Sequence, residues 1–486
     1  MQLHEYAGHD ALGLADLVAR GEVSPTELAR TAARAIELLN PQLHAVVETY
    51  ADRIDALDET TLGSGPFRGV PFLMKDVFGH EAGRRIEFGS RLCEGMVAEV
   101  DSVYCTLVKA SGVNVIGRSA APEYSMAGTT ETTLYGHTST PWRHGFCAGG
   151  STGGGAAAVA GGMVPIAQGT DIAGSIRMPA SFCGGVGLKP SRGRISFAPM
   201  LDENGYGLGQ NFVQTRSIRD TAAMLDCLAV PQPGDPFVIP RPAEPWRVLA
   251  QRPAPRPLRI GWSTAAHNGV AVDPEVAAAV QRTAQLLADM GHQVDEDTPA
   301  FDGPAAMHAM CTLWFFGFDG RLAGYGRRTG RTPGPDNLEP MVWKILQHAR
   351  TLGSAQFMAA MAALNTARRQ LGAVFARRDI WLTPTTPRVA EPWGPYSLCR
   401  DDVPYEGYVE QILAPVAQHT LPHNLMGTPA LSLPLAMHSN GLPIGVQIAA
   451  PPAQEHVLLQ LGAELETALP WAGRVPPLHV TRASAP

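Results

Sequence analysis

The chain has 486 residues, with 38 Lys and Arg against 45 Asp and Glu, so its formal net charge is −7. This mild acidity argues against a nucleic-acid-binding protein, because phosphate contacts need a basic face. Hydrophobic residues make up 45% of the chain and charged residues 17%, a composition typical of a large globular body. The seven cysteines are scattered and odd in number, which favours a reducing compartment over a disulfide framework.

The sequence predicts neither a secretory signal nor a membrane span. The first residues include acidic side chains and lack a basic segment ahead of a long apolar run. No run of 18 apolar residues occurs anywhere in the chain. We therefore expect a cytoplasmic protein with no membrane partner.

The predicted elements alternate between helices and strands. Two helices are expected within 11–40, and the second begins with Ser-Pro-Thr-Glu at 24–27, a capping box with proline at the first helical position. Further along the chain we expect strands at 69–74, 112–117, 257–262 and 379–383, and a helix at 274–290 that begins after Asp273 and ends at Gly291. This alternation predicts an α/β layered sheet.

The most proline-rich stretch, residues 231–257, is typical of a domain linker or of a long surface crossing. Because strand and helix patterns resume directly after it, we interpret it as a crossing within one body. The prediction is one domain over 1–486. Its parts are N-terminal helices in 1–65, core motifs in 66–200, and a variable substrate-pocket region with the remaining sheet in 201–486.

Two serines lie in turns built from small residues. The run GGSTGGG at 149–155 lets the backbone approach other groups closely, and a small-residue helix is expected over 156–160. The segment GTDIAGS at 169–175 forms a second such turn. Ser151 and Ser175 would converge if a helix and a strand fold back between them. The glycine spacing does not match a phosphate-binding loop.

Lysine is rare in this chain, with four residues at 75, 109, 189 and 344. Lys75 nevertheless follows the apolar run GVPFLM. Arginine stays protonated, whereas a buried lysine can lose its proton and act as a base. The alternative is that Lys75 is a strand-end cation paired with Asp76 or another acid, and spacing alone favours that alternative.

These motifs together resemble the amidase signature family, serine hydrolases that use a Ser–Ser–Lys triad. The resemblance rests on GVPFLMKD at 69–76, GGSTGG at 149–154 and GTDIAGSIRMPASFCGGVGLKP at 169–190. It extends to GEVSPTELARTA near the start, PEYSMAGTTET at 122–132, LTPTTP at 382–387, and MGTPALSLPL with GLPIGVQI near the end. It implies an α/β fold, a single large domain whose mixed central sheet is covered by helices on both faces.

The resemblance also implies a role for each residue of the motifs. Ser175 is implied as the nucleophile, Ser151 as the bridging serine after a cis Gly150–Ser151 peptide, and Lys75 as the general base. To accept a proton, Lys75 must be neutral, so its pKa must fall well below the ordinary value of about 10.4. The remaining implied residues are Ile172, Ala173, Gly174 and Ser175 for the oxyanion hole, and Gly150, Thr152, Asp171 and Arg177 for loop support.

Some positions depart from the usual family pattern. Ala173 stands where many members have glycine, a feature of members resembling aminohexanoate-cyclic-dimer hydrolases. Ser139, Thr140 and Cys147 differ in the segment before the first serine, which bears on contacts with the substrate. None of these departures removes a triad atom.

Specificity in this family resides in the region after residue 200, where aromatic residues gather. Candidate pocket residues are Met126, Trp314, Phe315, Phe316 and Trp343, although aromatic residues at helical spacing more often belong to a core. The expected activity is hydrolysis of C–N bonds in small uncharged, apolar or aromatic amides and anilides, extending to carbamates, urethanes or nylon-type oligomers. No metal or cofactor is expected, and the chain is expected to be a monomer or homodimer.

Three alternatives compete with this interpretation. Residues 149–153 fit G-x-S-x-G, which would make Ser151 the nucleophile of an α/β-hydrolase, although no HGGG segment occurs. An amidotransferase A-type subunit shares the family motifs but needs partner subunits and tRNA, which the acidic charge does not favour. His419 and His423 have the spacing of a metal pair, but Pro422 lies between them.

Overall fold

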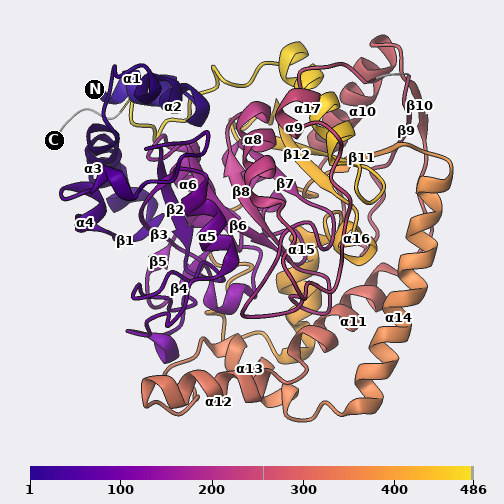
Figure 1. Cartoon of the computed structure of the whole chain (residues 1–486). Helices are drawn as coiled ribbons and strands as arrows, with labels where there is room; N and C mark the ends of the chain where they lie inside the picture. Colours follow the sequence, from indigo (N-terminus) through magenta and orange to yellow (C-terminus); the bar gives the residue numbers. More distant parts are fainter. Residues whose placement is uncertain (255–256, 483–486) are drawn as a thin grey trace.

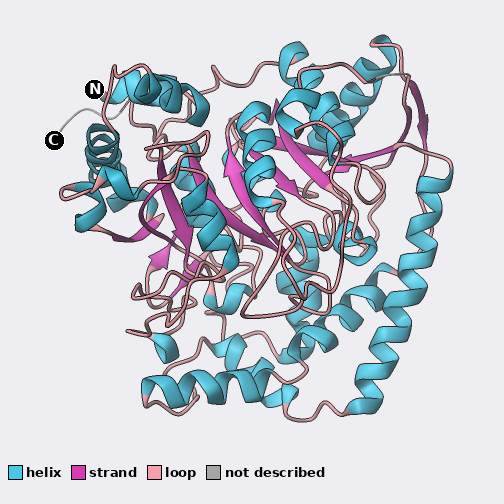
Figure 2. Ribbon diagram, viewed as in Figure 1, coloured by secondary structure: helices cyan, strands magenta, loops and turns pink. Residues whose placement is uncertain are grey.

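The computed structural model describes residues 1–254 and 257–482. Within this part of the chain a mixed sheet of eleven strands has the order β1-β3-β2-β6-β8-β7-β12-β13-β11-β9-β10. Helices surround the sheet (Figure 2). The predicted single domain with a mixed central sheet and flanking helices is confirmed.

The strands at the centre of the sheet are buried along their whole length. β2 pairs in parallel with β3 and β6, whereas β6 pairs with β8 in antiparallel register. The strands are β1 (Val46–Thr49), β2 (Pro71–Lys75), β3 (Asn114–Ser119), β6 (Ile166–Asp171), β7 (Val186–Lys189), β8 (Gln210–Thr215), β9 (Arg259–Trp262), β10 (Gln293–Glu296), β11 (Ile380–Pro384), β12 (Ala430–Met437) and β13 (Pro443–Ala449), with a separate hairpin of β4 (Glu131–Thr132) and β5 (Gly136–His137).

Most helices cover the sheet, and α11 to α14 form a separate group beside it (Figure 1). The helices are α1 (Leu3–Gly8), α2 (Ala11–Ala19), α3 (Pro25–Leu43), α4 (Ala51–Ile54), α5 (Val103–Ala110), α6 (Gly153–Ala160), α7 (Arg177–Cys183), α8 (Ile218–Leu228), α9 (Trp246–Leu249), α10 (Pro274–Asp289), α11 (Gly303–Phe315), α12 (Phe318–Thr329), α13 (Pro340–Ala349), α14 (Ser354–Gly372), α15 (Ala414–Ala417), α16 (Leu421–Met426) and α17 (Glu455–Ala468). Figure 1 shows α11 to α14, in salmon and orange, along the lower and right edges of the molecule. No described helix combines the length and apolar character needed to cross a membrane.

The elements predicted from the sequence are present with small shifts of their ends. The two helices within 11–40 are α2 and α3, the strands are β2, β3, β9 and β11, and the helix at 274–290 is α10 with Asp273 capping it. Only half of the expected capping box forms at α3. The Ser24 hydroxyl accepts a hydrogen bond from the Glu27 amide, whereas the Glu27 carboxylate pairs with the ammonium group of Met1.

The proline-rich stretch is a crossing within the domain, as predicted. Its described residues, 231–254 and 257, include the short helix α9, whose Trp246 side chain is buried. The Asp226 carboxylate of α8 accepts hydrogen bonds from the amides of Trp246 and Arg247. These contacts fix the crossing to the body of the molecule.

Helix α6 consists of glycine, alanine and one valine because it packs directly against backbone. A Cβ atom added to Gly154 would lie 2.4 Å from the amide nitrogen of Ala120 and 2.5 Å from the carbonyl oxygen of Ala45. Backbone atoms cannot move aside as a flexible side chain can. The small residues of α6 therefore set how closely the segment after Ser151 approaches the sheet.

Replacing Gly154 with alanine is expected to destabilise the fold by about 3 kcal/mol, because overpacking against backbone forces the surrounding elements to shift. The measurement is the free energy of unfolding in urea. The matched control is Gly372→Ala at the exposed end of α14, where nothing lies within 4 Å of the added Cβ. That change is expected to be neutral or stabilising by about 0.5 kcal/mol. Equal effects of the two substitutions would contradict the packing argument.

Candidate active site

Lys75 is the last residue of β2, and its side chain is buried. The side chain is 1% exposed. Its Nζ atom lies 2.8 Å from Ser151 Oγ, 2.7 Å from Thr170 Oγ1 and 3.2 Å from Thr152 Oγ1. A neutral amine donates two hydrogen bonds and accepts one through its lone pair. A hydroxyl can both donate and accept, so three hydroxyl partners satisfy a neutral lysine as well as a charged one.

The electrostatic surroundings of Lys75 disfavour its charged form. Its neighbour Asp76 pairs with Arg118 and accepts hydrogen bonds from the amides of Glu87 and Gly89. Lys75 forms no ion pair with a described carboxylate, so the pairing that the strand-end alternative expects is absent from the described part of the chain. Burial lowers the pKa of Lys75 well below its ordinary value, although the charges of Asp171 and Asp76 act in the opposite direction.

Ser151 belongs to the tight loop that leads into α6. The Gly150–Ser151 peptide is cis, as the resemblance implied, and Gly149 has a φ of 80°. A Cβ atom on Gly150 would lie 2.5 Å from the amide nitrogen of Thr129 and 2.4 Å from its carbonyl oxygen. Glycine is therefore required here, and the Ser151 hydroxyl is held within hydrogen-bond distance of Lys75.

Ser175 follows β6 in a turn that Asp171 organises. The Asp171 carboxylate accepts hydrogen bonds from the amides of Gly174, at 2.8 Å, and Ile176, at 3.2 Å. Arg177 donates to both carboxylate oxygens at 2.9 Å. Burial alone would raise the pKa of Asp171, but the Arg177 guanidinium holds that pKa below its ordinary value. A charged, fully buried pair thus fixes the backbone on both sides of Ser175.

A distant segment completes this support, and no motif in the sequence indicated it. Arg177 also donates to the Thr420 carbonyl oxygen at 2.8 Å and to Asn424 Oδ1 at 2.6 Å. Asn424 donates in turn to Asp171 Oδ1 at 2.9 Å. The Thr420 hydroxyl donates to the Ala173 carbonyl oxygen at 2.5 Å. Because the partners are 243 to 253 positions apart in the chain, no local spacing could have revealed these contacts.

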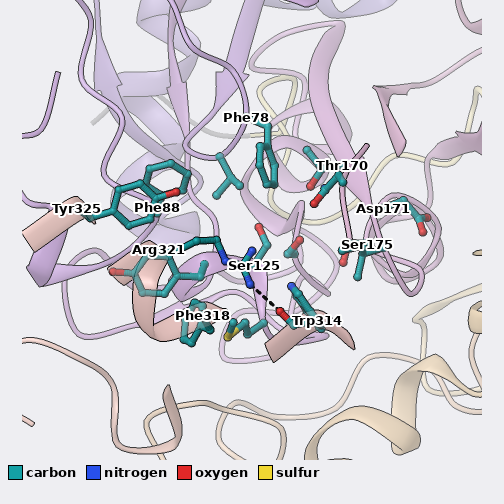
Figure 3. A pocket seen from close by; sticks show the side chains of 16 residues that line it. Phe78, Phe88, Ser125, Thr170, Asp171, Ser175, Trp314, Phe318, Arg321 and Tyr325 are labelled. Atoms are coloured by element: carbon teal, nitrogen blue, oxygen red, sulfur yellow. Dashed lines mark hydrogen bonds between the residues drawn. The ribbon is translucent and has the colours of Figure 1, made fainter. Parts of the chain in front are cut away.

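Ser151 and Ser175 line one pocket, together with Thr170, Asp171 and Ile172. Figure 3 shows Ser175 and Asp171 at one side of it and Tyr325 and Phe88 at the other. Aromatic and apolar side chains form the remaining walls. They are Val77, Phe78, Phe88, Tyr124, Met126, Trp314, Phe318 and Tyr325.

Two of the five predicted pocket residues line this pocket, and three do not. Met126 and Trp314 are part of the lining. Phe315 is buried against Tyr405 and Tyr408, Phe316 packs on Phe357, and Trp343 lies under Arg350. Trp314 and Phe315 are neighbours on α11 and point about 100° apart, whereas Phe316 lies beyond the end of that helix and Trp343 belongs to α13.

The pocket also contains polar groups that the sequence interpretation did not expect. Arg321, Asn204 and Ser125 belong to its lining. The five residues predicted for the pocket include no charged side chain, and the observed lining contains Arg321. The arginine was overlooked because the sequence holds many arginines, and only the position of α12 distinguishes this one.

Comparison with known proteins agrees with this arrangement. Residues 27–459 match the amidase family profile. The 6-aminohexanoate-cyclic-dimer hydrolase of Paenarthrobacter ureafaciens is 36% identical over 488 residues, covering 96% of each chain. The acylamidase of Rhodococcus erythropolis is 30% identical over 479 residues, again covering 96% of each chain.

A solved structure of a 6-aminohexanoate cyclic dimer hydrolase complexed with substrate superposes with a TM-score of 0.91 and 34% identity, covering 97% of this chain and 99% of that one. The fold and these matches define an enzyme of the amidohydrolase class. The chain belongs to the amidase signature family. The α/β-hydrolase alternative is thereby wrong, and residues 141–150 accordingly form no named strand before Ser151.

Proposed function

We propose that this enzyme hydrolyses C–N bonds of small, mainly apolar or aromatic amides and anilides through an acyl-enzyme on Ser175. The observation that carries the proposal is the buried 2.8 Å contact between Lys75 Nζ and Ser151 Oγ, in a pocket that Ser151 shares with Ser175. A neutral lysine, a relay hydroxyl and a second serine supply the proton acceptor, proton path and nucleophile of acyl transfer.

The first half of the reaction forms the acyl-enzyme. Ser175 Oγ attacks the amide carbon while its proton passes to Ser151 Oγ, and the Ser151 proton passes to Lys75 Nζ. The C–N bond then breaks, and the leaving nitrogen receives a proton from Ser151, which is restored by Lys75. Water attacks the ester by the same relay and releases the acid. Each proton taken up by Lys75 is returned in the same half-reaction.

The developing oxyanion needs amide donors that are not otherwise engaged. The Gly174 amide donates to Asp171, so we propose the amides of Ile172, Ala173 and Ser175 as the donors and leave Gly174 out of the predicted set. Gly174 instead serves the turn itself. Its φ is 133°, and a Cβ atom there would lie 2.2 Å from Thr420 Oγ1.

The walls support an apolar or aromatic substrate body. Phe88 stacks on Tyr325 with ring centroids 4.9 Å apart, and Phe318 meets Tyr124 edge to face at 5.5 Å. Such surfaces bind flat rings by buried area. Aryl carbamates and nylon-type oligomers would react through the same kind of covalent intermediate on Ser175. Nylon-type oligomers are included because one relative is a 6-aminohexanoate-cyclic-dimer hydrolase.

The substrate class can be tested by comparing kcat/KM for an acyl-anilide, an aryl carbamate, a linear aminohexanoate dimer and a peptide amide with charged side chains. We expect the anilide to be hydrolysed at least tenfold faster than the charged peptide amide, because burying the peptide's charges among aromatic rings is unfavourable. A preference for the peptide amide would contradict the proposal.

The amidotransferase alternative predicts a different result in the same assay. An A-type subunit needs its partners and an acceptor. We expect the purified chain alone to release product from the anilide without glutamine, tRNA or any other protein. Turnover that appears only after partner proteins and glutamine are added would favour the alternative instead.

A further inference from the structure

Arg321 belongs to the face of α12 that borders the substrate pocket. Phe318, Arg321 and Tyr325 follow one another at helical spacing and all three line the pocket. Figure 3 shows the Arg321 side chain reaching from its helix toward Trp314, on the side of the pocket away from Asp171 and Ser175. Arg321 is therefore placed to meet the far end of a bound substrate.

Most hydrogen-bond donors of Arg321 are unused. One Nη2 donor contacts the Trp314 carbonyl oxygen at 2.6 Å, and the guanidinium lies 5.3 Å from the Phe318 ring centroid. A guanidinium carries five N–H donors. No described carboxylate forms an ion pair with Arg321. An exposed cation without a counter-charge among the described residues therefore borders a cavity walled by aromatic rings.

A second polar group of the pocket lining has no partner in the described part of the chain. The Ser125 side chain is 8% exposed, and its Oγ atom makes no hydrogen bond with the described residues. Ser125 has a φ of 61°, which few residues other than glycine adopt. Leaving a buried hydroxyl unpaired is unfavourable. An acceptor atom supplied by a ligand would satisfy it.

The Arg321 side chain also connects the pocket to the outside. Arg321 and Tyr325 line both the inner pocket and an open depression on the outer side of α12, whose other residues include Arg327 and Arg328. A negative group bound by Arg321 would remain close to solvent, so its full desolvation is not required. The arginines of the depression would also attract anionic molecules toward this opening.

We propose that Arg321 and Ser125 form a distal acceptor subsite, which selects amides whose apolar body ends in a carboxylate or carbonyl oxygen. This inference rests on the proposed amide hydrolysis and narrows its substrate class. The guanidinium binds the terminal oxygen, the Ser125 hydroxyl donates a second hydrogen bond, and the aromatic walls hold the body in between. A negative charge on the substrate is thus accepted at the end that meets Arg321 and is unfavourable near the scissile bond.

The test uses two substrate series in which only the far end differs. In the first, acetanilide carries a para carboxymethyl, carbamoylmethyl or ethyl group, and the methylene insulates the ring from the substituent. In the second, the anilide is made from glutaric acid, its monoamide or hexanoic acid. In at least one series we expect wild type to prefer the carboxylate over the alkyl substrate by about tenfold in kcat/KM, the size of a charge-assisted hydrogen bond.

Arg321→Met is expected to abolish this preference, measured within each variant as the ratio of kcat/KM for the carboxylate substrate to kcat/KM for the alkyl substrate. Arg321→Lys should retain part of it, because the charge remains. Ser125→Ala should reduce the preference for both acceptor groups by a smaller factor. The matched control is Arg327→Met, which removes a charge from the same helix at a residue that lines only the outer depression. It should keep the preference.

A binding measurement separates this inference from the proposed chemistry. Titrating the carboxymethyl and ethyl compounds into Ser175→Ala, followed by tryptophan fluorescence or calorimetry, reports affinity without turnover. The subsite is supported if the carboxymethyl compound binds more tightly than the ethyl compound and if Arg321→Met removes this difference. Failure of wild type to hydrolyse either compound would contradict only the proposed anilide activity. The subsite would be overturned if the two compounds bound Ser175→Ala with equal affinity. It would also be overturned if the tighter binding of the carboxymethyl compound persisted after Arg321→Met was added to Ser175→Ala.

Discussion

Replacing Ser175 with alanine is expected to lower kcat for the best amide substrate by on the order of 10⁴ or more, with little change in substrate binding. The reason is that the nucleophile is lost while the pocket walls remain, and residues of a catalytic relay act as a unit. Ser151→Ala should give a comparable loss, because Lys75 then has no hydroxyl through which to reach Ser175. Steady-state kinetics on both variants is the direct measurement.

The position of the covalent bond distinguishes the two serines. A fluorophosphonate probe followed by peptide mass mapping should place the adduct on Ser175 in wild type. An adduct on Ser151 would reverse the assignment of nucleophile and relay. The control is Ser24→Ala, which removes a helix-capping hydroxyl at α3 far from the pocket. It should cost about 1 kcal/mol of stability and leave labelling and kcat unchanged.

The parts of this site that the sequence predicted are those encoded in short contiguous segments. Ser151 and Ser175 lie in turns whose glycines report close backbone approach, and α6 and β6 fold back between them as expected. The sequence indicates Lys75 because lysine is rare in this chain and Lys75 lies at the end of an apolar strand. Its lowered pKa, by contrast, depends on burial, and Asp76 is engaged by Arg118 from β3 rather than by Lys75. Only the assembled sheet brings those residues together.

The substrate pocket was predicted less well because its walls come from separate elements. Phe78 and Phe88 follow β2, Tyr124 follows β3, and Tyr325 belongs to α12. The run of aromatics at 314–316 attracted the prediction. Yet neighbours on a helix point about 100° apart, so Trp314 lines the pocket and Phe315 does not, while Phe316 lies beyond the end of α11. Composition identifies candidate rings, but the placement of α11 and α12 decides which of them meet the substrate.

Replacing Lys75 with arginine is expected to be nearly as damaging as replacing it with methionine, with kcat falling by about 10³ or more in both. A guanidinium keeps the positive charge but cannot accept the Ser151 proton near neutral pH. In wild type, burial lowers the pKa of Lys75, so the amine loses its proton below its ordinary range and kcat/KM should rise with pH through that depressed pKa. Residual activity of Lys75→Arg should not show this rise.

A structural cation at position 75 would give the opposite pattern. Lys75→Arg would then keep most of the wild-type rate, and Lys75→Met would lose stability together with activity. The matched control is Lys109→Arg. Lys109, in the last turn of α5, forms an ion pair with Asp101, and an arginine can keep that ion pair. That exchange should leave both rate and pH profile unchanged. Since Lys75 has hydroxyl partners and no described carboxylate partner, retaining its charge alone should not preserve activity.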